Sequence, residues 1–286
     1  MTLTDTADPA PTLDAAAPDR PPRLRADTVR LGYGGRDVVD GVTLDVPTGA
    51  VTAVVGPNGC GKSTLLRGLG RLLAPTGGSV LLDGREIGAL GTREVARRVG
   101  LLPQQPVVPA GVSVLELVER GRHPHHGLLG GWTRADERAV ASALERTDLV
   151  HLAAEPVESL SGGQRQRVWL ALVLAQEVPV LLLDEPTSFL DIAHQLDVLD
   201  LVRGLTDDTG TTVVMVLHDL GMAARYADHL VAMRDGRVVA EGRPEEVVTP
   251  AVVEEVFGVR AAVLADPDTG VPVVVPRHRV DDGGRR

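Results

Sequence analysis

The segment GPNGCGKST, residues 56–64, has the residue types and spacing of a loop that binds phosphate groups. It follows the apolar run AVTAVV and leads into the helical pattern STLLRGLGRLL. Glycines let backbone N–H groups close around phosphate oxygens, and the start of a helix adds a favourable electric field. The sequence therefore predicts a nucleotide site built from Gly56, Pro57, Asn58, Gly59, Cys60, Gly61, Lys62, Ser63 and Thr64.

Three residues of this loop are expected to have different roles. Lys62 is expected to reach the β and γ phosphates of ATP, and Ser63 to bind Mg²⁺. Cys60 is the only cysteine of the chain and occupies a position where a small spacer is sufficient. Two alternatives stay open: the loop is a glycine-rich turn that only caps a helix, and Cys60 is an alkylation site that ATP protects.

The segment VLLLDEP, residues 180–186, ends an apolar strand in two adjacent carboxylates. Asp184 is predicted to hold Mg²⁺, directly or through water, and Glu185 to deprotonate a water that attacks the γ-phosphate. Acidic residues end many strands, but downstream of a phosphate-binding loop the pattern indicates ATP hydrolysis.

The segment LSGGQRQR, residues 160–167, provides a second candidate anion site. Ser161, Gly162 and Gly163 leave backbone N–H groups free at the start of a helix, unless they form an ordinary helix cap. A single chain with two separate phosphate sites needs an explanation.

With these motifs in this order, the sequence resembles the ATP-binding cassette (ABC) subunits of membrane transporters over about residues 24–276. In that family two cassettes pair head to tail, and each ATP lies between the phosphate loop of one copy and the LSGGQ segment of the other. The resemblance therefore implies that this chain pairs with a second copy of itself, and that Ser161, Gly162, Gly163 and Gln164 complete the partner's ATP site.

The resemblance also assigns residues outside these motifs. Tyr33 looks like the aromatic residue that stacks on adenine, although a buried core tyrosine is the alternative. Gln104, in LLPQQ, resembles a glutamine that contacts Mg²⁺ and the attacking water, with the neighbouring Gln105 as the alternative register.

Two further positions follow strands of the predicted core. His218 resembles a histidine that hydrogen-bonds the γ-phosphate, and Asp191, in SFLD, matches the loop where the two cassettes meet. The family more often has alanine where this chain has Phe189, which leaves the packing of that loop open.

The pattern of the chain predicts an α/β fold of the ABC-type P-loop NTPases, with a parallel-sheet core. Short apolar runs with turns from residue 24 indicate an N-terminal antiparallel β subdomain, and helical periodicity indicates a helical insertion at about residues 88–165. Hairpins are expected in DHLVAMRDGRVVAEG and AAVLADPDTGVPVVV. The predicted organisation is a disordered extension at 1–23, one ABC ATPase domain at 24–276 and a solvated tail at 277–286.

Composition restricts the class of partner. A formal net charge of −10 argues against a nucleic-acid binder, and one cysteine gives no reason to expect an oxidising compartment. The N-terminus does not have the pattern of a signal peptide, and no run of about 18 apolar residues occurs, so the chain is not expected to span a bilayer.

These features, read with the resemblance, imply an ATPase subunit at the cytoplasmic face of the membrane, bound to transmembrane permease subunits and linked indirectly to an extracytoplasmic substrate-binding protein. The segments VLELVERGRHPHHGLL, WTRADERAV and TSFLDIAHQLDVL are similar to ATPases that power uptake of ferric siderophores. Haem, cobalamin or a free metal ion as cargo, and a soluble ABC ATPase without a transport role, are the alternatives.

The segment GRHPHH, residues 121–126, gathers three of the chain's eight histidines. Clustered imidazoles can bind a transition metal, but Pro124 breaks helical geometry and no cysteine lies nearby. The resemblance places this segment in the helical insertion that meets the permease, so a docking surface is the expected role of His123, His125 and His126.

Overall fold

The computed structural model describes residues 22–104, 106, 110–127, 131–188 and 190–280. Its centre is a six-stranded sheet with the strand order β10-β9-β3-β8-β7-β6, in which only the edge strand β10 runs antiparallel to its neighbour. The strands are β3 (Val51–Val55), β6 (Val99–Leu102), β7 (Val180–Asp184), β8 (Thr212–Val216), β9 (His229–Arg234) and β10 (Arg237–Gly242). The predicted parallel-sheet core is confirmed.

Alternate residues of the central strands supply two different hydrophobic cores. On β3, Val54 faces one core, whereas Val51, Ala53 and Val55 face the other. The same alternation on β7 and β8 explains why these strands are apolar throughout: a parallel sheet with both faces covered buries every side chain.

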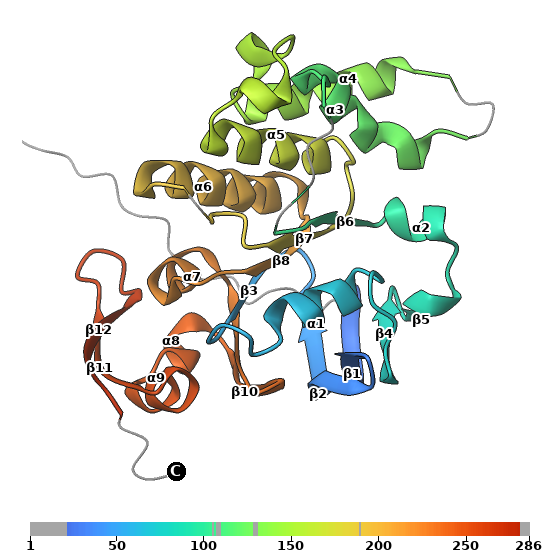
Figure 1. The fold of residues 1–286 in the computed structure, drawn as a ribbon. Coiled ribbons are helices and arrows are strands. Elements are labelled where there is room, and N and C mark those ends of the chain that lie inside the picture. The colour runs from blue at the N-terminus through green and yellow to red at the C-terminus, as the bar shows by residue number, and fades with distance from the viewer. Residues whose placement is uncertain (1–21, 105, 107–109, 128–130, 189, 281–286) are drawn as a thin grey trace, which may run out of the picture.

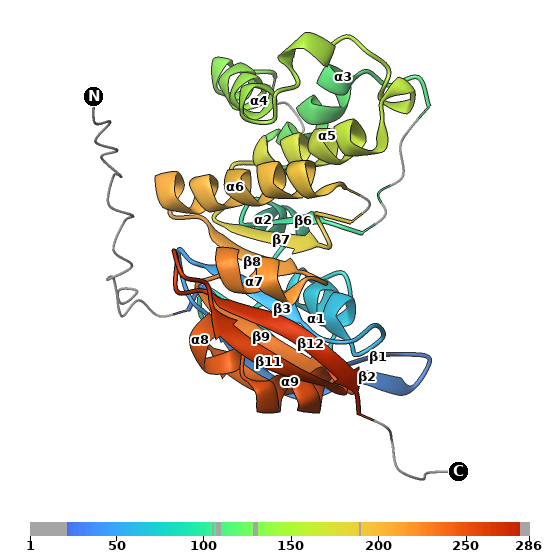
Figure 2. The same ribbon diagram turned by 90° about the vertical axis from the view of Figure 1, so that its left-hand side faces the viewer.

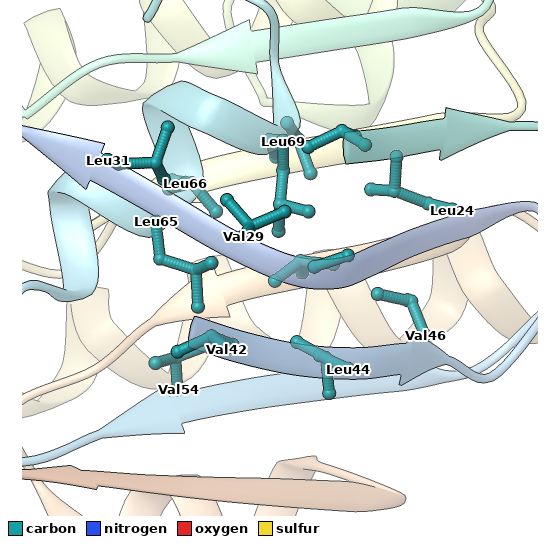
Figure 3. Packing of buried hydrophobic residues seen from close by; sticks show 14 of the residues in the cluster. Leu24, Val29, Leu31, Val42, Leu44, Val46, Val54, Leu65, Leu66 and Leu69 are labelled. Carbon is teal, nitrogen blue, oxygen red and sulfur yellow. The ribbon is translucent and has the colours of Figure 1, made fainter. Parts of the chain in front are cut away.

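The first core lies between the central sheet and an N-terminal antiparallel sheet with the order β2-β1-β4-β5. Figure 3 shows Leu24, Val29 and Leu31 of β1 packing toward Leu65 and Leu69 of a helix that follows the phosphate loop. The elements are β1 (Leu24–Tyr33), β2 (Arg36–Val46), β4 (Gly77–Leu82), β5 (Arg85–Glu86) and helix α1 (Lys62–Leu69). The expected antiparallel β subdomain is thus present.

The second core lies on the opposite face, under helices from the C-terminal half. These are α6 (Ile192–Thr209), α7 (Leu220–Tyr226), α8 (Pro244–Val247) and α9 (Pro250–Phe257). The hairpin of β11 (Val259–Ala265) and β12 (Pro272–Arg279) packs against the same core through Val263 and Val274. Figure 2 shows this hairpin crossing in front of β9 and α9. Both predicted hairpins, β9–β10 and β11–β12, are confirmed.

A helical unit with its own small core stands above the central sheet in Figure 1. It contains α3 (Val114–Glu119), a short 3₁₀ segment η2 (Arg120–His125), α4 (Arg134–Arg146) and α5 (Gly162–Leu174). Helix α5 contributes Leu170 and Val173 to the second core and Val168 and Ala171 to the small core. It therefore joins the helical unit to the sheet.

Two predicted boundaries differ from the structure. The helical insertion does not begin at about residue 88, because Val99–Leu102 forms β6, which pairs with β7 in the central sheet after the short helix α2 (Thr92–Ala96). A four-residue apolar run carries no periodicity that separates a strand from a helix, so only pairing decides it. The tail also begins later than residue 277, since β12 continues to Arg279. The extension predicted as disordered lies mainly in residues 1–21, outside the described residues.

Candidate functional site

The phosphate loop connects β3 to α1 and turns sharply at glycines. At Gly56, φ is +150°, and a Cβ would lie 2.2 Å from the carbonyl oxygen of Met233. Gly61 caps α1 with a φ of +106°. Only glycine fits these two positions, because one is crowded by backbone and both have a positive φ.

The side chain of Lys62 folds back over this loop. Its Nζ donates hydrogen bonds to the carbonyl oxygens of Gly56, at 2.8 Å, and Pro57, at 3.0 Å. The residue is 5% exposed. Two carbonyl oxygens thus hold the amino group of this side chain at the loop, where it can contact an anionic ligand.

Ser63 and Asp184 meet although 121 positions separate them in the sequence. Ser63 Oγ donates to Asp184 Oδ1 at 2.8 Å, which joins the start of α1 to the end of β7. Burial raises the pKa of Asp184, and the hydrogen bond from Ser63 only partly opposes this effect. Such a buried carboxylate beside a hydroxyl favours a nearby cation, which would offset the lost hydration.

Glu185 follows Asp184, and three polar side chains contact its carboxylate. Gln104 Nε2 donates to Oε2 at 2.6 Å, Ser188 Oγ donates to the same oxygen at 2.9 Å, and His218 Nε2 lies 2.6 Å from Oε1. Burial raises the pKa of Glu185, but the contacts with His218, Ser188 and Gln104 outweigh it, so the pKa lies below its ordinary value. Glu185 therefore stays ionised at neutral pH.

The backbone of Glu185 also departs from strand geometry. Its φ is +54°, a left-handed conformation that is uncommon for a residue with a side chain. This left-handed conformation ends the extended course of β7 at Glu185, whose carboxylate contacts Gln104 and His218. An uncommon backbone angle at a carboxylate with three polar partners is typical of a functional position.

A pocket of about 330 Å³ opens between these groups. It brings together the phosphate loop, the end of β6, the end of β7 and the end of β8, as expected where parallel strands end at one edge of a sheet. Its lining consists of Asn58, Gly59, Gly61, Lys62, Ser63, Thr64, Gln104, Glu185 and His218.

Other predicted site residues lie away from this pocket. Tyr33, at the end of β1, is 47% exposed, and its hydroxyl oxygen accepts a hydrogen bond of 3.3 Å from Arg67 Nη1. The alternative of a buried core tyrosine is therefore wrong. Cys60 is 4% exposed, and burial raises the pKa of its thiol, which disfavours the alkylation hypothesis for the folded chain. Gln105 and Phe189 lie outside the described residues.

The segment LSGGQ lies on an exposed surface at the start of α5. The hydroxyl of Ser161 accepts from the backbone N–H of Gln164, whose side chain accepts from the backbone N–H of Ser161. This capping box satisfies two N–H groups; at the same helix start Gly162 is exposed and Gly163 is half-buried. Of the described residues that line the 330 Å³ pocket, none belongs to this segment.

Asp191 caps the next helix along the chain, α6. Its Oδ1 accepts from the backbone N–H of His194 at 2.9 Å and from His194 Nδ1 at 2.7 Å. The backbone hydrogen bond of His194, followed by its side chain, lowers the pKa of Asp191. Sequence reasoning assigned no role to His194 or to the side chain of Ser188, which bonds Glu185.

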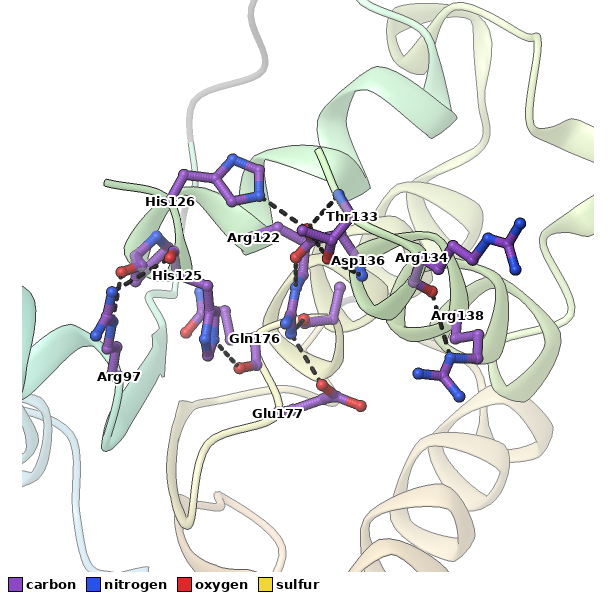
Figure 4. A network of polar contacts seen from close by, with 12 residues as sticks. Arg97, Arg122, His125, His126, Thr133, Arg134, Asp136, Arg138, Gln176 and Glu177 are labelled. Atoms are coloured by element: carbon purple, nitrogen blue, oxygen red, sulfur yellow. Dashed lines mark hydrogen bonds and ion pairs between the residues drawn. The ribbon is translucent and has the colours of Figure 1, made fainter. Parts of the chain in front are cut away.

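The histidines of GRHPHH form protein contacts (Figure 4). His125 Nε2 lies 2.8 Å from the carbonyl oxygen of Gln176, and His126 Nε2 lies 3.1 Å from Asp136 Oδ2. The ring of His126 also meets Trp132 edge-on at 5.6 Å. Two of the three imidazoles thus have partners that a metal would displace, and the described residues contain no group of three metal-binding side chains.

A buried arginine holds this segment in place. Arg122 is 5% exposed; its Nε donates to Asp136 at 2.9 Å, and its Nη1 donates to the carbonyl oxygen of Ala175 at 2.7 Å and to Glu177 at 3.0 Å. From the sheet side, Arg97 donates to the carbonyl oxygens of Pro124 and His125. GRHPHH therefore ties the helical unit to the segments that precede β6 and β7.

Comparison with known sequences gives a consistent result. The sequence model of the family described as ABC transporter matches residues 39–188. The chain is 51% identical over 257 residues to the ferric enterobactin transport ATP-binding protein FepC of Escherichia coli K12, covering 90% of this chain and 95% of FepC. It is 43% identical to the iron(3+)-hydroxamate import ATP-binding protein FhuC of Bacillus subtilis 168, covering 87% and 93%.

Solved structures agree with the sequences. A dimeric structure of MJ0796, a bacterial ABC transporter cassette, superposes with a TM-score of 0.70 at 29% identity, covering 77% of this chain and 98% of that one. A post-hydrolysis dimer of the same cassette, bound to ADP and phosphate, gives 0.68 at 30% identity, covering 77% and 98%.

Proposed function

The chain belongs to the ABC transporter family, and we propose that it is the ATP-hydrolysing subunit of an importer for ferric siderophores. One observation supports the enzymatic role above all others. Lys62, Gln104, Glu185 and His218 come from four separate segments and line one pocket beside the phosphate loop. This set can bind the phosphates, place a water and accept its proton.

Glu185 is the proposed general base. Its depressed pKa keeps it as a carboxylate at neutral pH, so that it can accept a proton from a water placed against the γ-phosphate. Gln104 and His218 hold its two oxygens in place. His218 is 46% exposed on the pocket side of this contact, where its imidazole can also reach the γ-phosphate.

Ser63 Oγ and Asp184 are the proposed holders of Mg²⁺, with Gln104 at the pocket edge as a further oxygen donor. Hydroxyl, carboxylate and amide oxygens are the ligands that this hard cation prefers, and the 2.8 Å contact already brings two of them together. When bound, the cation would neutralise charge on the phosphates. We expect a divalent cation to be required for turnover but not for folding.

A second copy of the chain is proposed to complete each site. The pocket lacks any lining residue from 161–164; Ser161 and Gly162 are exposed at the start of α5, and Gln164 beside them is half-buried. If the start of α5 faces the phosphates of a partner's ATP, its free N–H groups can donate hydrogen bonds to the phosphate oxygens. Head-to-tail pairing brings these two half-sites together, which agrees with the dimeric cassettes among the similar structures.

The proposed place of action is the cytoplasmic face of the membrane, on a permease. None of the helices in the described part of the chain is long and apolar enough to cross a bilayer. The proposed transport path belongs to the permease. The helical unit that carries GRHPHH is the proposed permease contact. An extracytoplasmic binding protein would deliver cargo to the permease without touching this chain.

The cargo proposal relies on the relatives. Proteins named for transport of ferric enterobactin, petrobactin, achromobactin and ferric hydroxamates are 43–51% identical to this chain. Cobalamin import proteins of Halobacterium salinarum are 46% identical, but the match spans 60% of their length. Ferric siderophore is therefore the first candidate, and haem and cobalamin are alternatives.

Uptake assays in cells lacking this chain test the cargo. We expect loss of uptake of a radiolabelled ferric siderophore and unchanged uptake of haem and cobalamin. Complementation by Glu185→Gln should fail, which ties uptake to hydrolysis. Loss of haem or cobalamin uptake alone would replace the proposed cargo.

Purification from membranes tests the transport role itself. The affinity-tagged chain should co-purify in a fixed ratio with one polytopic membrane protein. A chain that purifies alone from cells with active uptake would favour a soluble ABC ATPase instead.

A further inference from the structure

The strongest unassigned feature lies on the proposed dimer surface, where the ring of His194 stands between two segments. One edge of the ring, Nδ1, lies 2.7 Å from Asp191 Oδ1. The opposite edge faces Gly163: a Cβ built there would lie 3.9 Å from His194 Cδ2 and 3.5 Å from Leu190 Cδ2. The ring is therefore bonded to Asp191 on one side and lies beside the start of α5 on the other, close enough that a single methyl group on Gly163 would touch it.

The direction of the hydrogen bond fixes the state of the ring. The lowered pKa of Asp191 keeps its carboxylate ionised, so it can only accept. His194 Nδ1 must then carry a proton and donate. The backbone N–H of His194 donates to the same oxygen at 2.9 Å, so one residue binds Asp191 twice.

A second contact connects the same two regions further along α5. Gln166 Nε2 donates to the carbonyl oxygen of Pro186 at 2.9 Å, just after Glu185. Gln195 Nε2 donates to the carbonyl oxygen of Leu190 at 3.0 Å, which fixes the backbone beside Asp191. His194 is the side chain that extends this connection to the first turn of α5.

Stability of the folded chain does not account for this arrangement. The side chains of His194 and Asp191 are 43% and 67% exposed, and an exposed pair of this kind contributes little to the stability of the folded chain. Both residues instead lie where the second copy is proposed to bind.

We propose that His194 is a positioning residue that holds Asp191 and the LSGGQ segment in one fixed arrangement for binding to a second copy. The proposal rests on the composite ATP site proposed above. Without the imidazole, each segment must be ordered separately when the dimer closes, and that ordering costs free energy. Closure on ATP should then need more nucleotide, while the phosphate loop of each copy is unaffected.

The test uses the full chain in a Glu185→Gln background, in which ATP should trap the dimer. Dimer formation is followed by analytical ultracentrifugation against ATP concentration. We expect His194→Ala to raise the ATP concentration for half-maximal dimer by about five- to tenfold, in the range of coupling between residues in contact. His194→Asn should restore most of the loss, because its amide N–H can occupy the place of Nδ1.

His151 provides a matched control. Its Nδ1 lies 3.9 Å from Asp148 Oδ1 at the same three-residue spacing, and its side chain is 62% exposed. We expect His151→Ala to dimerise like the parent. ATP binding at a concentration where the chain stays monomeric reports the Lys62 pocket alone and should be equal in all variants.

The outcomes separate the two proposals. If the parent dimerises with ATP and His194→Ala matches it, or if His194→Asn is as defective as His194→Ala, the role of His194 is rejected and the composite site stands. A weaker monomer affinity in His194→Ala would also reject it. If the parent fails to dimerise with ATP, the proposed composite site is rejected, and the proposed role of His194 is rejected with it.

Discussion

Glu185 and His218 lie in contact, with Oε1 and Nε2 2.6 Å apart, across the ends of the neighbouring strands β7 and β8. Gln104 and Ser188 donate to the other oxygen of the same carboxylate. These contacts hold Glu185, the proposed base, in place before substrate binds. Such preorganisation reduces the rearrangement that the reaction requires.

Replacing the base tests its role directly. Glu185→Gln keeps the shape of the side chain but cannot accept a proton, so we expect kcat to fall about 100-fold or more. ATP affinity should be retained, and ATP-bound dimer should accumulate. Steady-state ATPase assays combined with ultracentrifugation measure both effects. Turnover close to that of the parent would exclude Glu185 as the base.

The pH profile tests the contact with His218. Burial raises the pKa of Glu185 and the hydrogen-bonding side chains lower it below its ordinary value. Removing His218 therefore moves this pKa upward, and the acid limb of the kcat/KM profile should shift to higher pH. His278→Ala, a change on the exposed end of β12, serves as the control. A His218→Ala variant with lower activity but an unmoved acid limb would contradict this account.

Replacing Lys62 tests whether this loop binds phosphate groups. It is the only lysine in the chain, and its buried ammonium group is held by the carbonyl oxygens of Gly56 and Pro57. We expect Lys62→Ala to weaken ATP binding by about tenfold or more, since a charge-assisted contact with phosphate is lost. Calorimetry measures the affinity. An unchanged Kd would mean that Lys62 does not contact the phosphates.

Breaking the buried pair of Arg122 and Asp136 tests whether GRHPHH stabilises the fold. Asp136→Asn removes the charge opposite a buried guanidinium, so we expect the free energy of unfolding to fall by about 3 kcal/mol. The hydrogen bond from Thr133 and the contact with Arg122 hold the pKa of Asp136 well below its ordinary value. Its stabilisation is therefore present above about pH 4 and is lost as pH falls further.

Denaturant titrations at neutral and acidic pH measure this effect. Asp148→Asn is the matched control, because Asp148 is 82% exposed and its pair with Arg167 has a distance of 3.6 Å. That variant should change stability by less than about 0.5 kcal/mol. Equal effects of the two variants would show that the buried pair is no more important than a surface contact.

Cys60 reports on the phosphate loop. Because it is 4% exposed and burial raises the pKa of its thiol, we expect a bulky thiol reagent to react slowly with the folded chain and quickly after denaturation. Ser159→Cys, at an exposed position, gives the reference rate. Rapid labelling of folded Cys60 would mean that the loop opens in solution.

Contiguous motifs made much of this site predictable. The phosphate loop, the carboxylates after β7 and the LSGGQ helix cap each form over fewer than ten residues, where glycine freedom, capping and the carboxyl end of a strand determine the conformation locally. The order of these motifs also indicated the family and the parallel sheet. Residue 88 as the start of the helical insertion was wrong, because the short run of β6 acquires its identity only by pairing with β7.

The sequence by itself thus determined which groups are present and what chemistry they favour. Only the tertiary structure decided which of them meet: Ser63 with Asp184 across 121 positions, and Gln104 with Glu185 across 81. It also showed that GRHPHH is held by protein contacts and that His194 is bonded to Asp191 and lies beside Gly163 of the signature segment. The physical reason is that parallel strands and packed helices bring distant segments to one edge of the sheet, and no local pattern specifies which side chains face each other there.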